Sequence, residues 1–150
     1  MQIFLKLIFL LLIGNNSITS PNSIIVSGSA MFPTLVNGQR ITINKIDKNF
    51  IRGDIIIFKY PKDQSQLFIK RIVGLPGESL QIKNESVYIN DLKIDESGYL
   101  PAQVKTYGNA IGTTLKNDEY FVLGDNRTAS SDSRIWGALK RELIVGKYVK

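Results

Sequence analysis

The sequence contains neither cysteine nor histidine. Without cysteine there can be no disulfide, thiolate metal site or thiol nucleophile, although the compartment stays open because an exported protein need not be cross-linked. Without imidazole, Ser-His-Asp and Cys-His catalytic groups and His-ligated metal centres are excluded. Proton transfer near neutral pH must therefore use lysine, carboxylate, tyrosine or water, and lysine becomes a prominent candidate base.

A dense basic run is also missing, although the formal net charge is +6 and the pI is near 9.6. Such a charge suits an anionic partner, either nucleic acid or acidic membrane headgroups. The lysines and arginines are scattered, and no RNA-binding aromatic signature accompanies them. We interpret the charge as a solvated, membrane-facing surface and predict no nucleic-acid partner. Strong, salt-dependent DNA or RNA binding by a form lacking residues 1–20 would favour the alternative, a basic nucleic-acid-binding β-barrel.

The one long apolar run is residues 1–14, interrupted only by Gln2 and Lys6. A membrane-spanning helix needs about 20 apolar residues, so this run is short for one. A cleavable signal peptide would end in a small-residue site, and residues 18–20 offer only a poor match. The residues alone leave both an uncleaved anchor and a removed signal open.

After the N-terminus no segment sustains a helical period, and the 150-residue length suits one domain. Alternating or short apolar runs bounded by glycine, proline and asparagine predict a mainly β fold. Short helical turns are predicted near 133–139 or 140–143, and residues 96–117 form a weakly periodic excursion. The predicted strands are 40–44, 54–60, 67–73, 80–83, 87–90, 119–123 and 143–149, with a hairpin turn at 84–86.

A lysine occurs within the apolar strand predicted over residues 67–73. Alternation places Lys70 on one face together with Phe68 and Ile72. Burial disfavours an ammonium and lowers the pKa of a lysine, which makes it a workable general base. The alternative is an edge lysine whose side chain reaches water along the strand.

Two further stretches contain residue types suited to a site. Residues 27–35 read SGSAMFPTL, where glycine and proline suit a segment that presents a residue to an extended peptide. Residues 124–137 read GDNRTASSDSRIWG and directly follow a predicted strand. By residue type alone, the second stretch is a surface turn with Asx-type hydrogen bonds.

Taken together, these stretches resemble the type I signal peptidases, a family of membrane-bound serine proteases that use a Ser/Lys dyad. The similarity covers nearly all of the chain after the N-terminal run. It includes 27–35, the box KRIVGLPGE at 70–78, Gly53 and Asp54, and the GDNR, Ser130 and DSR elements within 124–134. The resemblance implies an antiparallel β-fold with a small inserted cap at about 79–118 and one N-terminal membrane helix. It favours the anchor, so we expect an anchor at 1–20 and a catalytic domain at 21–150.

The resemblance also implies roles for individual residues. Lys70 falls on the general base, Ala30 on the nucleophile position, and Ser130 on the residue that hydrogen-bonds the lysine amine. Support is expected from Asp125, Asp132 and Arg134 acting as one charge-assisted network. Oxyanion donors are expected near Ser27 and the residue-30 amide, beside a strand formed by 27–30. The apolar pocket lining is expected to be Met31, Leu35, Phe68 and Ile69.

The implied partners are the signal peptides of exported precursors and membrane lipids. The expected location is the plasma membrane, with a single pass and the catalytic domain on the extracytoplasmic face. No metal or other cofactor is implied.

The sequence departs from the family at the residue that would perform the chemistry, because Ala30 precedes Met31 where family members carry serine. Alanine has no hydroxyl with which to attack a carbonyl. The chain is then either a natural, non-catalytic scaffold that binds peptides or assists surface-protein assembly, or an enzyme carrying a Ser→Ala substitution. Intact supporting boxes favour the second reading. A self-cleaving Ser/Lys repressor-type protease would need a DNA-binding domain ahead of the core, for which the apolar N-terminus leaves no room.

Overall fold

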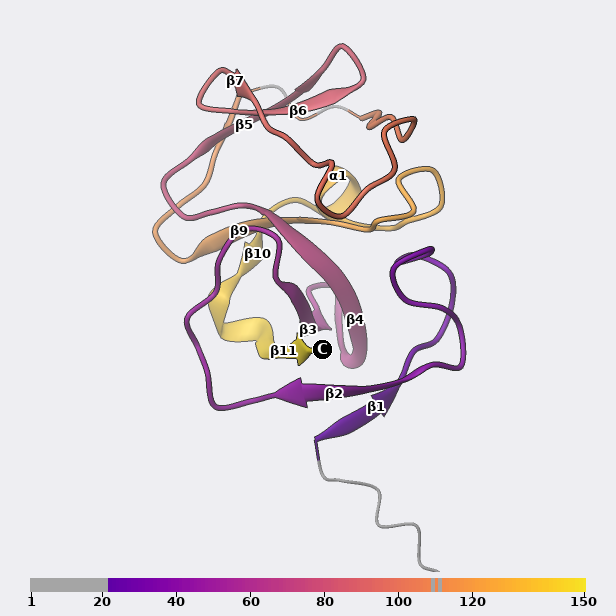
Figure 1. Ribbon diagram of the computed structural model, residues 1–150. Coiled ribbons are helices and arrows are strands. Elements are labelled where there is room, and N and C mark those ends of the chain that lie inside the picture. Colours follow the sequence, from indigo (N-terminus) through magenta and orange to yellow (C-terminus); the bar gives the residue numbers. More distant parts are fainter. Residues whose placement is uncertain (1–21, 109, 111) are drawn as a thin grey trace, which may run out of the picture.

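The computed structural model describes residues 22–108, 110 and 112–150, and its regular secondary structure is almost entirely antiparallel β-strand (Figure 1). The anchor predicted at 1–20 lies outside the described residues. Within the part that is described, no helix is both long and apolar enough to cross a membrane. The mainly β fold expected from the apolar pattern is confirmed.

The larger sheet has seven strands in the order β1-β2-β11-β3-β4-β9-β10. Its central strands, β3 and β4, pair from Ile55↔Arg71 to Tyr60↔Asp63 and carry the apolar runs that predicted buried strands. The seven strands are β1 (Ser23–Ile25), β2 (Arg40–Asn44), β3 (Ile55–Tyr60), β4 (Asp63–Gly74), β9 (Glu119–Leu123), β10 (Leu139–Lys140) and β11 (Ile144–Val149). Two short helical elements, α1 (Ser133–Trp136) and η1 (Arg141–Leu143), lie where helical turns were predicted.

The smaller sheet has four strands in the order β7-β6-β5-β8 and is inserted between β4 and β9. Its strands are β5 (Ser79–Lys83), β6 (Ser86–Ile89), β7 (Leu92–Lys93) and β8 (Thr113–Thr114). The predicted hairpin is present, with a two-residue turn in which Asn84 and Glu85 have φ of 49° and 58°. Positive φ at both turn residues matches the twist of the flanking strands. This sheet lies within residues 79–118, where the cap was expected.

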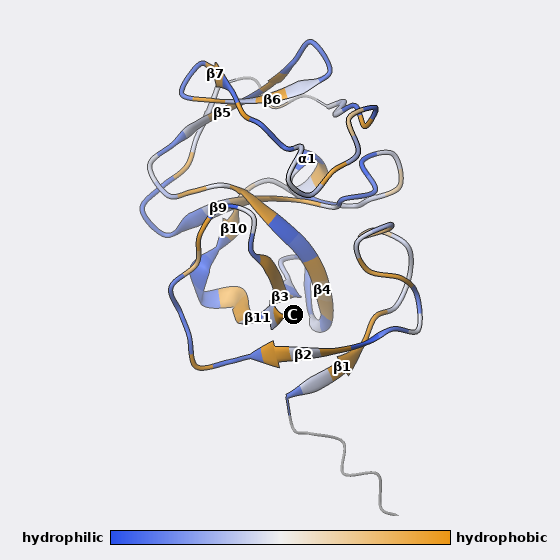
Figure 2. Cartoon of the chain, in the orientation of Figure 1, coloured by the Kyte–Doolittle hydropathy of each residue, from blue (hydrophilic) through white to orange (hydrophobic). Residues whose placement is uncertain are grey.

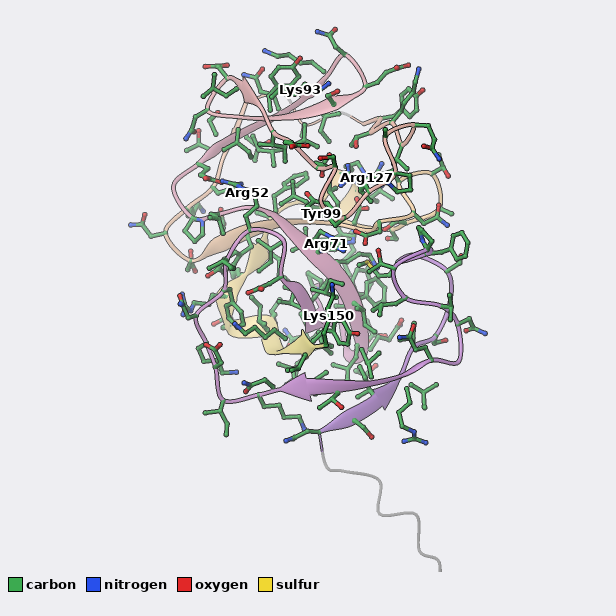
Figure 3. All side chains as sticks on the ribbon, viewed as in Figure 1. Arg52, Arg71, Lys93, Tyr99, Arg127 and Lys150 are labelled. Atoms are coloured by element: carbon green, nitrogen blue, oxygen red, sulfur yellow. The ribbon has the colours of Figure 1, made fainter. Side chains whose placement is uncertain are left out.

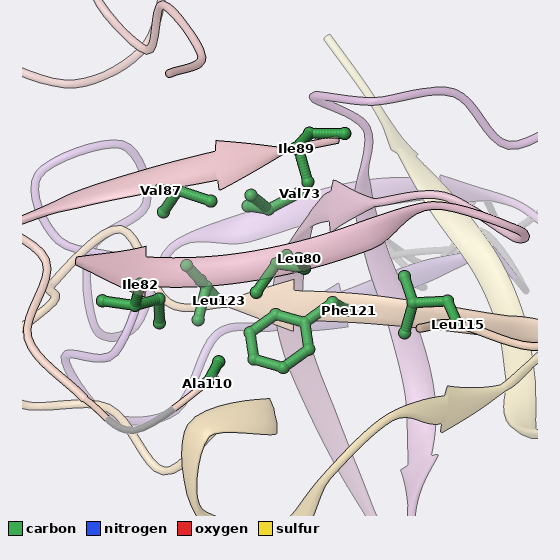
Figure 4. Close-up of a cluster of buried hydrophobic side chains, with 9 residues drawn as sticks. All are labelled: Val73, Leu80, Ile82, Val87, Ile89, Ala110, Leu115, Phe121 and Leu123. Carbon is green, nitrogen blue, oxygen red and sulfur yellow. The ribbon is translucent and has the colours of Figure 1, made fainter. Parts of the chain in front are cut away.

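One apolar cluster joins the two sheets. Val73 and Leu123 come from the larger sheet, and Leu80, Ile82 and Val87 come from the β5–β6 hairpin (Figure 4). Two other clusters lie within the larger sheet, one of them beneath β1 and β2. Along β4 the hydropathy changes from apolar to hydrophilic and back (Figure 2), and the charged residues of that strand's buried part are Lys70 and Arg71.

Candidate active site

Lys70 lies in the interior of the larger sheet. β4 runs between β3 and β9, and Lys70 pairs with Ile56 in register. The lysine is only 4% exposed, so the alternative of an edge lysine reaching water is wrong. Its Nζ donates to the Ile69 carbonyl at 3.0 Å and lies 5.0 Å from the ring centroid of Phe68.

Burial changes the acid–base behaviour of Lys70. Loss of hydration disfavours the ammonium and lowers the pKa of Lys70 to about 8, while the negative charge of Asp132 opposes this shift. Among the described residues, no carboxylate pairs with the Lys70 amine. A substantial fraction of the amine is therefore neutral at mildly alkaline pH and able to accept a proton.

Ala30 lies in a turn rather than in the strand expected over residues 27–30. β1 ends at Ile25, and residues 30–34 form turns in which Phe32 N donates to Ser29 O and Leu35 N donates to Met31 O. The expectation of a strand here is wrong because local turn bonds take the place of sheet pairing. An extended edge for substrate at this position would have to come from β1 instead.

Asn126 holds this turn against the loop that follows β9. Its backbone N–H donates to the Ala30 carbonyl at 3.0 Å, and its Nδ2 donates to the Ser29 carbonyl at 3.1 Å. The turn is therefore held at Ser29 and Ala30 by two hydrogen bonds from a residue almost a hundred positions later in the chain. These bonds fix residue 30 against the loop at 124–127.

A cleft of about 410 Å³ brings together Ala30, Lys70, Ser27 and most of the predicted pocket lining, whereas the four predicted supporting residues at 125–134 do not line it. Leu35 is an exception, because it is 0% exposed and packs in the core beneath β1 and β2, so its expected place in the pocket is wrong. The sequence analysis did not predict residues 24–26 and 66–67 as part of the lining. The apolar run at 24–26 was the only sequence signal that could have indicated the first of these segments. The cleft is lined by residues that we predicted, namely Ser27, Ala30, Met31, Phe68, Ile69 and Lys70, and by Ile24, Ile25, Val26, Gly28, Gln66, Leu67 and Ser131.

Ser130 lies beside residue 30 but does not bond the lysine in this structure. Its Oγ is buried and has no hydrogen-bond partner, while the Lys70 amine donates to a backbone carbonyl. Gly124 makes this approach possible, since a Cβ there would lie 2.2 Å from Ser130 Oγ and 2.5 Å from the Ala30 carbonyl oxygen. Only glycine fits between the serine and residue 30 at position 124.

The expected single network of acidic and basic supports is instead two buried ion pairs. Asp125 accepts from Arg71 Nε at 2.8 Å and from Arg71 Nη2 at 2.6 Å, and also from Thr34 Oγ1. Asp132 accepts from Arg134 Nε and Nη2, each at 2.8 Å, and from the Gly124 N–H at 3.0 Å. Burial alone would raise the pKa of Asp132, but the bonds from Arg134 and Gly124 outweigh it and leave the pKa lowered.

Arg127 connects this loop to the cap; the sequence analysis included it in the GDNR element but gave it no role. It is almost fully buried, donates to Glu96, Thr106 and the Gly124 carbonyl, and lies near Tyr99 and Arg71 in Figure 3. Tyr99 donates to Glu96 and its ring stacks 4.1 Å from the Arg71 guanidinium. Glu96 and Tyr99 both lie in the weakly periodic excursion at 96–117, where no sequence pattern identified them.

Across residues 22–108, 110 and 112–150, no three acidic side chains gather in a way that could hold a metal ion. The titratable side chain that lines the cleft is Lys70, whose amine lies in the same cleft as the backbone turn at residue 30.

The fold and the cleft define a class of protein, namely a mainly antiparallel β protein in which a buried lysine lines an apolar cleft. The family model for "Signal peptidase, peptidase S26" matches residues 1–150. The chain therefore belongs to the signal peptidase family.

Named relatives agree with this assignment. The chain is 42% identical over 121 residues to Signal peptidase I U of Bacillus subtilis, a match covering 73% of this chain and 63% of that protein. It is 41% identical over 120 residues to Signal peptidase I P of Bacillus subtilis subsp. natto, covering 73% of this chain and 64% of that protein. The match thus spans less than two-thirds of either relative's length.

A solved structure is also similar. The crystal structure of a signal peptidase I from Enterococcus faecalis matches with a TM-score of 0.57 and 30% identity. That match covers 67% of this chain and 97% of the other. The antiparallel β architecture is thus shared with a signal peptidase I.

Proposed function

We propose that this chain is a serine endopeptidase of the signal peptidase I type that is inactive because Ala30 occupies the nucleophile position; with serine there, it removes N-terminal signal peptides from exported proproteins. One observation carries the proposal. Lys70, with its pKa lowered to about 8, lines the same cleft as Ala30. A desolvated lysine beside the position of an attacking hydroxyl is what a Ser/Lys dyad requires.

With serine at residue 30, the reaction follows from these positions. Neutral Lys70 accepts the hydroxyl proton while the serine oxygen attacks the scissile carbonyl. The residue-30 amide and a donor from Ser27 stabilise the oxyanion. The amide nitrogen of the mature protein then leaves with the proton from Lys70, and water activated by Lys70 hydrolyses the acyl-enzyme.

The substrate is an extended signal peptide with small residues at the first and third positions before the cut. Met31, Phe68 and Ile69 provide apolar walls, and the backbone beside β1 offers main-chain hydrogen bonds. Ser130, with its buried and unpartnered hydroxyl, would turn to the lysine amine when substrate excludes water from the cleft. Asp125, Asp132 and Arg134 hold the loop that carries it.

We also infer a plasma-membrane location, with an anchor at residues 1–20 and the domain at 21–150 on the extracytoplasmic face. The apolar run at 1–14, the basic surface and membership of the family support this. The full-length chain should resist extraction by high salt and alkali and come off with detergent. Release by salt alone would contradict the anchor, and protection of the domain from added protease in intact cells would contradict its orientation.

A second function is favoured by one specific observation, Ala30 itself. A chain without a hydroxyl at this position could serve as a signal-peptidase-like scaffold that binds peptides or assists assembly of surface proteins. Both functions predict peptide binding, so cleavage by a serine revertant separates them.

The decisive variant is Ala30→Ser. The unchanged protein should bind a membrane-inserted precursor with alanine at both small-residue positions without cutting it. Ala30→Ser should raise the cleavage rate by a factor on the order of 10⁶, the scale on which loss of a serine nucleophile acts. Because the base must be neutral, kcat/KM of the revertant should rise with pH and level off above about 8.

Two controls accompany it. Lys70→Met in the Ala30→Ser background should abolish cleavage. Ala129→Ser, which adds a hydroxyl at an exposed position in the loop that follows β9, should create no cleavage. A folded, peptide-binding revertant that remains inert would overturn the dyad and leave the scaffold function in its place.

A further inference from the structure

A second hollow, of about 540 Å³, lies next to the candidate cleft. It is lined by the turn at residues 32–33, the cap segment at 101–107 and the loop at 125–128. We call it the distal hollow. The residues on which the argument depends are Phe32, Pro33, Val104, Tyr107, Asn126 and Thr128.

The distal hollow and the candidate cleft are separated only by consecutive residues of one turn. Ala30 and Met31 line the cleft, and Phe32 and Pro33 line the distal hollow. Asn126 lines the distal hollow while its N–H holds the Ala30 carbonyl. A peptide that passes residue 30 and leaves the cleft over this turn therefore reaches the distal hollow next.

The lining of the distal hollow is suited to an apolar side chain. Phe32 and Tyr107 are large rings that remain 54% and 53% exposed, and Tyr107 is oriented by its hydroxyl, which donates to Glu85 at 3.0 Å. Val104, Pro33 and Pro101 add further apolar surface. Exposed rings around a concavity gain most by stacking on another aromatic or apolar group.

Charged groups around the distal hollow already have partners. Asp125 is paired with Arg71, Arg127 with Glu96, and Lys105 with Glu85. An acidic or basic ligand side chain would have to compete with these pairs. An aromatic or aliphatic side chain displaces only water, which favours it as the occupant.

We propose that the distal hollow binds the first residues after the scissile bond, on the mature side of the precursor, and prefers an aromatic or large apolar side chain there. This inference rests on the proposed function, because it places the scissile bond at residue 30. A second copy of the chain or a lipid surface would be a different occupant, and the test separates them.

The unchanged protein is the right material, because Ala30 allows binding to be measured without cleavage. Three peptides share one signal-side segment, which ends at the scissile position in the first peptide. The second continues with Ala-Phe-Ala and the third with Ala-Asp-Ala. We expect the Phe peptide to bind about tenfold more tightly than the other two, the scale of one well-packed ring.

Tyr107→Ser should remove most of that gain while leaving the affinity for the signal-side peptide unchanged. The matched control is Leu92→Ser, since Leu92 is also exposed, at 74%, but lies in β7 outside the distal hollow. Leu92→Ser should keep the full gain. Titration calorimetry or fluorescence anisotropy on the full chain in detergent gives the Kd values.

The outcomes are distinguishable. If none of the three peptides binds, the proposed function fails and this inference with it. If the signal-side peptide binds but the Phe extension adds nothing, or Tyr107→Ser retains the gain, the distal hollow does not bind the mature side and the proposed function stands. If Tyr107→Ser leaves peptide binding unchanged but weakens self-association, the surface belongs to a second copy of the chain. If it leaves peptide binding unchanged but weakens vesicle binding, the surface belongs to lipid.

Discussion

The interiors of the two sheets differ in kind. In the described residues every buried charged side chain lies on β4 or in the loop at 125–132, and this set is Lys70, Arg71, Asp125, Arg127 and Asp132. The cluster beneath the smaller sheet is wholly apolar. Burying a charge costs desolvation energy, which apolar packing does not. The concentration of buried charges around residue 30 therefore indicates a functional site rather than a region selected for stability. The smaller sheet packs against the larger one through this apolar cluster, without buried charges of its own among the described residues.

Lys70 and its neighbour Arg71 differ in how the charge of each is paired. Arg71 forms a bidentate ion pair with Asp125, which neutralises its charge. The amine of Lys70, in contrast, donates only to a backbone carbonyl. Arginine cannot give up its proton, so its charge must be paired, but lysine can respond to burial by losing its proton. The same strand therefore carries one side chain whose charge is permanent and paired, and one whose charge is labile.

The largest stability effect should come from breaking the permanent pair. Asp125→Asn keeps the shape of the side chain but leaves the Arg71 charge buried without its counterion, which should cost about 3–5 kcal/mol of unfolding free energy. Denaturant unfolding of residues 22–150 measures this. Asp118→Asn makes the same chemical change at an exposed site and should shift stability by less than about 0.5 kcal/mol. Equal effects in the two variants would mean that burial of the Asp125–Arg71 pair is unimportant.

A somewhat smaller effect should appear in the pH dependence of stability. The pKa of Lys70 is about 8 in the folded protein, against 10.5 ordinarily, so the unfolded chain binds more protons between those values. Stability contributed by Lys70 should therefore rise with pH across that window, by roughly 3 kcal/mol in total, and stay constant below it. Subtracting the curve of Lys70→Met from that of the unchanged protein isolates this group. A flat difference from pH 7 to 10.5 would show that the lysine remains hydrated.

The same contrast explains how much the sequence could predict. Strands whose one face packs on a core, such as 40–44, 55–60 and 119–123, were found within a residue because burial imposes a regular apolar pattern. The start of β4 was missed, since residues 63–66 are polar and exposed and extend the hairpin by backbone pairing alone. The turn at residue 30 was missed because its local hydrogen bonds have no period.

Site residues divide in a similar way. The apolar strand drew attention to Lys70 but left an edge lysine open, and the motif resemblance assigned the roles both of Lys70 and of the residues at 124–134. Leu35 was misplaced because a hydrophobic residue near a cleft and one beneath it look alike in sequence. Glu96 and Tyr99, which brace Arg127 and Arg71 from the cap, were not predictable, since their partners are about thirty residues distant and share no pattern.

The smallest effect should follow a conservative change in the apolar interior. Ile89 lies in the cluster shown in Figure 4, and Ile89→Val removes one methylene without altering charge. It should cost about 0.5–1.5 kcal/mol, because neighbouring aliphatic side chains close part of the space. In the Ala30→Ser background, the pH profile of cleavage should be unchanged, since no part of Ile89 lines the candidate cleft. Thermal unfolding and the pH profile, measured on the same preparation, test both statements. A shifted pH profile in Ile89→Val would mean that packing in the smaller sheet sets the environment of Lys70, and that the two interiors are not separate in function.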